Sequence, residues 1–143
     1  MNVVRAGSTV SDPGAVILDT GQKLQTEILR GDEIKKAGLG AEDASATEVV
    51  VIRFDPVKKG QSVRLRISET YTDPGRYGVV DGQLVWHRSF GRPFNDVVLP
   101  EGWYLTASSI PAVVRQETDG RTRLEFVNPR PDEVDVILKA KRR

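Results

Sequence analysis

Apolar and polar residues alternate with a period of two along much of the chain, which is the pattern of β-strands with one buried and one exposed face. Residues 62–69 give the clearest case, because Val63, Leu65 and Ile67 are separated by arginines. Half-buried strands of this kind are typical of antiparallel sheets. The same alternation predicts strands at residues 22–29, 121–127 and 133–140.

Other segments are strand-like without strict alternation. Residues 48–54 include four consecutive apolar positions, which predicts a central strand that is buried on both faces. Asp81-Gly82 and Asp119-Gly120 stand between strand-like runs, and glycine accepts the positive φ that a tight hairpin turn requires. Further short strands are predicted at residues 15–18, 84–88, 97–99, 103–107 and 112–116.

Only residues 32–37 have the pattern of a helix, with Asp32 as the N-cap and Gly38 as the stop. The tract 38–47 is rich in glycine, alanine, serine and acidic residues and predicts an exposed loop. About nine to ten short strands with one short helix predict an all-β fold. We expect a two-sheet antiparallel β-sandwich, immunoglobulin-like in broad shape, that forms a single domain over residues 1–143. A closed barrel is the alternative.

Length and composition agree with one folded domain, since the 143 residues are 38% hydrophobic and 29% charged. There are 21 Lys and Arg against 20 Asp and Glu, so the net charge of +1 gives no general attraction to nucleic acid. We therefore expect no nucleic-acid partner, and we interpret the basic residues of 139–143 as a solvated end that keeps an edge strand soluble. No run approaches the roughly 20 apolar residues of a membrane span, so none is predicted.

The residue types that carry most enzyme chemistry are scarce. Cysteine is absent and His87 is the single histidine, which excludes thiolate nucleophiles and zinc sites with several histidine or cysteine ligands. A Ser-His-Asp triad would have to use His87 as its base. We predict no catalytic residue, no metal site and no cofactor, and we favour a role without enzyme activity.

Seven of the nine aromatic residues lie between Tyr71 and Tyr104. One interpretation is a core with large connecting loops. The other is a ligand platform, in which exposed rings stack on sugars while arginine, amide and carboxylate groups bind hydroxyls or anions. The arginines of residues 88–96 also have two interpretations. They form an anion-binding loop, or they pair with Asp96 and with loop carbonyls. The candidate ligand-binding residues are Tyr77, Trp103, Tyr104, Arg88, Arg92, Asn95 and Asp96.

A resemblance rests on turn and corner residues that extend over most of the chain. These residues are Tyr71-Thr72-Asp73-Pro74 with Tyr77, Arg88-Ser89-Phe90-Gly91-Arg92-Pro93-Phe94-Asn95, Leu99-Pro100-Glu101-Gly102-Trp103-Tyr104-Leu105, and Asp119-Gly120-Arg121 followed by Leu124, Phe126 and Asn128. Together with Arg5-Ala6-Gly7-Ser8 and Asp12-Pro13, this tract resembles β-sandwich domains of exported bacterial proteins whose function is uncharacterised. The resemblance implies a module of a larger envelope or secreted protein and supplies no catalytic residue.

These observations predict a non-catalytic β-sandwich module that docks, spaces or binds a ligand as an accessory domain of a larger exported protein. We favour a periplasmic or extracellular location over the cytoplasm. The expected partners are other domains of the same protein or of a partner protein. The alternative is a carbohydrate-binding module that holds polysaccharide through exposed aromatic rings, and a small hydrolase is the third hypothesis. The best-placed surface comprises residues 71–77, 88–96 and 100–104.

Overall fold

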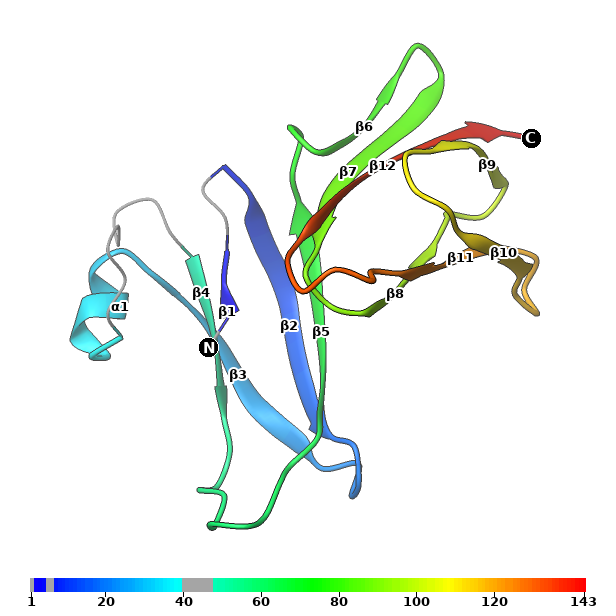
Figure 1. Cartoon of the computed structure of the whole chain (residues 1–143). Coiled ribbons are helices and arrows are strands. Elements are labelled where there is room, and N and C mark those ends of the chain that lie inside the picture. The colour runs from blue at the N-terminus through cyan, green and yellow to red at the C-terminus, as the bar shows by residue number, and fades with distance from the viewer. Residues whose placement is uncertain (1, 5–6, 40–47) are drawn as a thin grey trace. The chain divides into compact units, whose positions relative to one another are not determined.

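The computed structural model describes residues 2–4, 7–39 and 48–143 (Figure 1). Most of the loop predicted at 38–47 therefore lies outside the described residues. The chain forms two compact units, a first unit of Met1–Asp73 and a second unit of Pro74–Arg143. The prediction of a single domain over residues 1–143 stays a prediction.

The prediction of an all-β antiparallel fold is confirmed, since 56% of the described residues are in strands and 4% in helix. The described residues form eleven strands of four residues or more and a two-residue strand, β1, against the nine or ten expected. The main addition is β6 (Tyr77–Val80), which has only four residues and contains a glycine. Short strands of this kind carry too little alternation to stand out in a sequence.

The first unit is one five-stranded antiparallel sheet in the order β1-β4-β3-β2-β5. Its strands are β1 (Asn2–Val3), β2 (Thr9–Ile17), β3 (Lys23–Arg30), β4 (Glu48–Arg53) and β5 (Leu65–Thr72). Val4, Val10 and Val50 form a buried cluster on one face of this sheet. Val49 is also fully buried, and strand alternation places it on the opposite face. This burial on both faces is what the apolar run at 48–54 predicts.

Strand β2 is longer than the run predicted at 15–18 because a bulge carries the strand across Pro13. Asp12 has a positive φ of 50°, and the pairing of β2 with β5 shifts register between Ser11 and Gly14. A bulge is one of the few places in a sheet that accepts a proline, which cannot donate a ladder hydrogen bond.

The predicted helix is confirmed as α1 (Asp32–Lys36), and it ends before Gly38, which has a φ of 68°. The prediction that Asp32 caps the helix is wrong. The N-cap is Gly31, with no side-chain hydrogen bond, and Asp32 lies in the first turn. An acidic residue in that turn still interacts favourably with the helix dipole.

Glu48 joins three strands of the first unit. Its Oε2 accepts a hydrogen bond from the amide of Val10 in β2 at 2.9 Å, and its Oε1 accepts one from Nε of Arg30 in β3 at 2.6 Å. The bond from Val10, followed by the bond from Arg30, holds the pKa of Glu48 below its ordinary value of 4.5. The ionised form is therefore the form that stabilises the fold.

We expect Glu48→Gln to reduce stability at neutral pH and to remove part of the acid sensitivity of the native chain. Because the folded pKa is lowered, the stabilisation by Glu48 is present above the unfolded pKa and is lost as pH falls through the folded pKa. Urea unfolding followed by far-UV circular dichroism should show a difference between native chain and variant that shrinks below about pH 4.5. A difference that stays constant from neutral to acid pH would contradict this account.

The second unit consists of two antiparallel sheets, β6-β7-β12-β9 and β10-β11-β8. Its other strands are β7 (Gln83–Phe90), β8 (Phe94–Val98), β9 (Trp103–Ser108), β10 (Val113–Gln116), β11 (Thr122–Val127) and β12 (Val134–Arg142). Both sheets contribute to one core: Phe90 of β7 lies 5.4 Å from Phe126 of β11 between ring centroids. The core residues are Leu84, Phe90, Leu99, Leu124, Phe126, Val136, Leu138 and Ala140. Two sheets over a shared core make this unit sandwich-like.

The two predicted hairpins are present in this unit. Asp81 and Gly82, with φ of 50° and 73°, join β6 to β7 as a two-residue turn between Val80 and Gln83. Positive φ at both central residues is the requirement of a type I′ turn. The second hairpin joins β10 to β11, and Gly120 supplies its positive φ of 83°.

Asn128 is the one buried polar residue that the described chain contains, and it fixes the connection from β11 to β12. Its Nδ2 donates to the carbonyl of Phe90 at 2.8 Å and to that of Asp132 at 2.9 Å, while its Oδ1 accepts from the amide of Arg130 at 2.9 Å. These bonds satisfy backbone groups that the prolines at 129 and 131 keep out of regular pairing.

Candidate docking site

Two apolar surfaces of the second unit are uncovered, and the first lies at strand β6. The register pairs Tyr77 with Trp86 and Val79 with Leu84, so Tyr77 and Val79 lie on the same face of the sheet as buried Leu84. Tyr77 is nevertheless exposed, and Val79 is 60% exposed. The three-stranded sheet therefore leaves β6 uncovered.

A cavity of about 220 Å³ opens at this place, between the two sheets. It extends to core residues, and none of its lining side chains carries a charge. The lining residues are Tyr77, Leu84, Trp86, Val97, Val98, Leu99, Pro100 and Leu138. We call the region between β6 and β8, with this cavity, the open side.

Both strands that border the open side are sheet edges. The described chain pairs β6 with β7 alone and β8 with β11 alone. Hydrogen-bonded and non-hydrogen-bonded residue pairs alternate along two antiparallel strands. The His87 amide donates to the carbonyl of Arg76, just before β6, so the backbone groups of Tyr77 and Val79 point away from β7. In β8, the bond from the Leu99 amide to the Thr122 carbonyl likewise turns the backbone of Asp96 and Val98 towards the open edge.

The second uncovered surface is on the outer face of the three-stranded sheet. Phe94 of β8 is 79% exposed and stands directly opposite Val127 of β11, which is also exposed. Val113 of β10 pairs with Glu125, so it shares this face with Val127, and it is 53% exposed. We call Phe94, Val113 and Val127 the outer apolar face.

A groove of about 520 Å³ runs beside the outer apolar face. Its lining is mostly apolar. The lining residues are Ile110, Pro111, Ala112, Val113, Glu125, Val127, Pro129, Arg130 and Val134. The two charged residues are already paired, because Glu125 binds Arg115 at 3.0 Å and Arg130 binds Asp132 at 2.7 Å.

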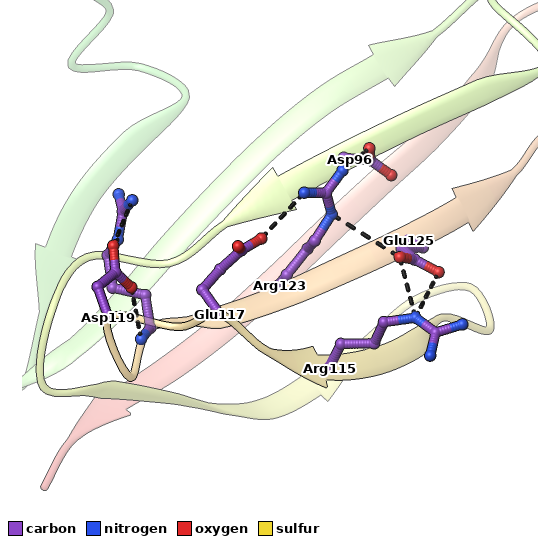
Figure 2. A network of polar contacts seen from close by, with 7 residues as sticks. Asp96, Arg115, Glu117, Asp119, Arg123 and Glu125 are labelled. Atoms are coloured by element: carbon purple, nitrogen blue, oxygen red, sulfur yellow. Dashed lines mark hydrogen bonds and ion pairs between the residues drawn. The ribbon is translucent and has the colours of Figure 1, made fainter.

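The charge network of Figure 2 borders these apolar residues on the same face of the sheet. Arg123 donates to Glu117 at 2.9 Å and to Asp96 at 2.5 Å, while Arg115 binds Glu125. The hydrogen bond to Glu117, followed by that to Asp96, raises the pKa of the Arg123 guanidinium above its ordinary value. Exposed pairs of this kind add little stability, but they neutralise one another on the border of the apolar residues.

The predicted polar site residues do not converge on one point. Asp96 pairs with Arg123 of β11, 27 residues away in the sequence. Asn95 Nδ2 donates to the carbonyl of Arg92 at 2.7 Å, which closes the loop between β7 and β8. Arg88 pairs in register with buried Val136 and so lies on the core-facing side of β7, where it is half-buried.

The three predicted aromatic site residues are also separated. Tyr77 is on β6 and Trp103 and Tyr104 are on β9, which are opposite edges of the four-stranded sheet. Trp103 is half-buried and packs against the core, whereas Tyr104 is exposed on the other face of the same strand. The opposite orientation of these two neighbours follows from strand alternation, but the choice of which ring packs inward depends on the partner sheet.

His87, Ser89 and Asp135 lie together on an exposed sheet surface, but not in the order of a catalytic triad. Ser89 Oγ donates to Asp135 Oδ1 at 2.7 Å, and His87 Nε2 is 3.8 Å from the same oxygen. A triad requires the imidazole to accept the hydroxyl proton and the carboxylate to hold the other ring nitrogen. Here the hydroxyl is bonded to the carboxylate itself.

Comparisons with models of protein families, with curated proteins and with solved structures found no match for this chain. Within the described residues, no group of three or more His, Asp or Glu side chains is arranged to hold a metal ion. None of the helical structure in the same residues has the length and apolarity of a membrane-crossing helix.

Proposed function

We propose that this chain is a non-catalytic β-module that docks another protein through the outer apolar face of its second unit. The observation that carries the proposal is the side-by-side placement of Phe94, Val113 and Val127 beside an apolar groove. Contiguous exposed apolar residues with a polar border are typical of protein–protein contact sites. The partner is a protein surface, on another domain of the same protein or on a second protein, that presents apolar side chains.

The charge network supports this role. Arg115 pairs with Glu125, and Arg123 pairs with Asp96 and Glu117, so a partner that covers this network leaves none of its cations or carboxylates without a counter-charge (Figure 2). The partner therefore needs apolar side chains at the centre of the contact rather than complementary charges. Export of the module, and a sugar-binding or hydrolytic role, stay predictions.

The adjacent valines of β10 give a matched test. Val113 and Val114 are 53% and 56% exposed, and they point to opposite faces of the strand. With a photo-crosslinking phenylalanine analogue at position 94 of the full chain in its native cell, we expect a discrete protein adduct. Val113→Asp should reduce the adduct about tenfold or more, and Val114→Asp should leave it unchanged, at equal thermal stability.

Failure to form any discrete adduct would overturn the proposal. So would an adduct that survives Val113→Asp, or one that Val114→Asp removes equally, because the contact would then not depend on the outer apolar face.

A further inference from the structure

The open side differs from the outer apolar face because it combines an apolar cavity with two unpaired strand edges. The cavity extends to Leu84 and Leu138 of the core, so a side chain that enters it joins the interior of the unit. Val79 points towards the same side yet is 60% exposed. An apolar side chain that enters the cavity would also cover Val79, and no lining residue offers a charged occupant a partner.

The sheet edges restrict the form of this occupant. The backbone groups of Asp96 and Val98 point out of the three-stranded sheet, and no other strand of the described chain pairs with them. A helix or a small molecule would fill the cavity but leave these groups without backbone partners. An extended strand beside β8 pairs with them and directs every second side chain over β6.

We propose that the open side is a strand-acceptor site, in which a partner protein donates an extended segment that pairs with β8 as the fourth strand of its sheet. The inward side chains of the segment are apolar, cover Tyr77 and Val79 and enter the cavity. Strand β8 borders both surfaces, but the cavity and the outer apolar face lie on opposite faces of the three-stranded sheet, since Val97 lines the cavity and Phe94 points the other way. Strand addition to an exposed edge is a recurrent mode of peptide recognition.

Two neighbouring valines again provide a matched pair. Val79 and Val80 are each 60% exposed, on the same strand, but only Val79 points towards the cavity. The probe is a phage-displayed library of random peptides of about twelve residues, long enough for one strand. Selection on the wild-type chain should yield sequences with apolar residues at every second position.

A synthetic peptide of the selected sequence should slow amide exchange at Asp96 and Val98 about tenfold or more. In a Trp103→Phe background it should also shift the fluorescence of Trp86, which lines the cavity. Val79→Glu should weaken binding about tenfold or more, and Val80→Glu should not.

Three results would overturn the proposal: selected peptides without alternation, equal binding to the two glutamate variants, or unchanged exchange at Asp96 and Val98. A fourth contrary result would come from sedimentation of the wild-type chain alone. A dimer that Val79→Glu dissociates would show that a second copy, rather than a partner strand, covers the open side. The Val79→Glu and Val80→Glu pair tests the open side, whereas the Val113→Asp and Val114→Asp pair tests the outer apolar face, so the two proposals fail separately.

Discussion

Replacing Phe126 by alanine is expected to destabilise the second unit by about 3–5 kcal/mol. Phe126 is among the largest fully buried side chains, and its ring packs against Phe90 of the opposite sheet. Its removal leaves a cavity at the contact between the two layers, which the strands cannot close without breaking their ladders. Both tryptophans of the chain, Trp86 and Trp103, belong to this unit, so urea unfolding followed by tryptophan fluorescence reports its stability.

Val127→Ala is the control for this experiment, because Val127 follows Phe126 on the same strand and is exposed. Its substitution should change stability by less than about 0.5 kcal/mol. Similar losses for the two variants would mean that the inward face of β11 has been assigned wrongly.

Asn128→Ala is expected to cost about 3 kcal/mol, although Asn128 contributes no apolar packing to the core. The substitution leaves the carbonyls of Phe90 and Asp132 and the amide of Arg130 without their present partner. Groups that stay buried without a hydrogen bond carry their full desolvation cost. The same fluorescence-detected unfolding measures the loss.

Asn95→Ala provides the comparison, since Asn95, near the start of β8, makes a single side-chain bond, to the solvent-exposed carbonyl of Arg92. There water replaces the lost partner, and the cost should be about 1 kcal/mol or less. If Asn128→Ala proved as mild as Asn95→Ala, the segment after β11 would not be held by the buried amide.

The strands and turns of this protein are predictable because they depend on local patterns. Alternation located β5, β11 and β12, and the Asp-Gly pairs located both hairpins, since each needs only its own residues. The coverage of each face depends on distant segments. Ile67 has the alternation of a buried position in β5 and is nevertheless exposed, because alternation identifies a face without identifying what packs on it.

The candidate site shows the same division. Trp103 and Tyr104 belong to opposite faces by alternation alone, but only the packing of two sheets places Trp103 inward. The pair of Asp96 with Arg123 joins residues on separate strands, and no spacing rule connects them. Val79 and Val127 were missed for a related reason: a valine in a strand is ordinary in sequence, and only its exposure makes it notable.

The internal neutralisation of the outer sheet face has a kinetic consequence. Because Arg115 and Arg123 already face Glu125, Glu117 and Asp96, they project little net field towards an approaching molecule. A partner would reach Phe94 by unguided diffusion, with an association rate of about 10⁵–10⁶ M⁻¹s⁻¹ that ionic strength barely changes. The lifetime of such a complex would then depend on how fast its apolar contacts separate.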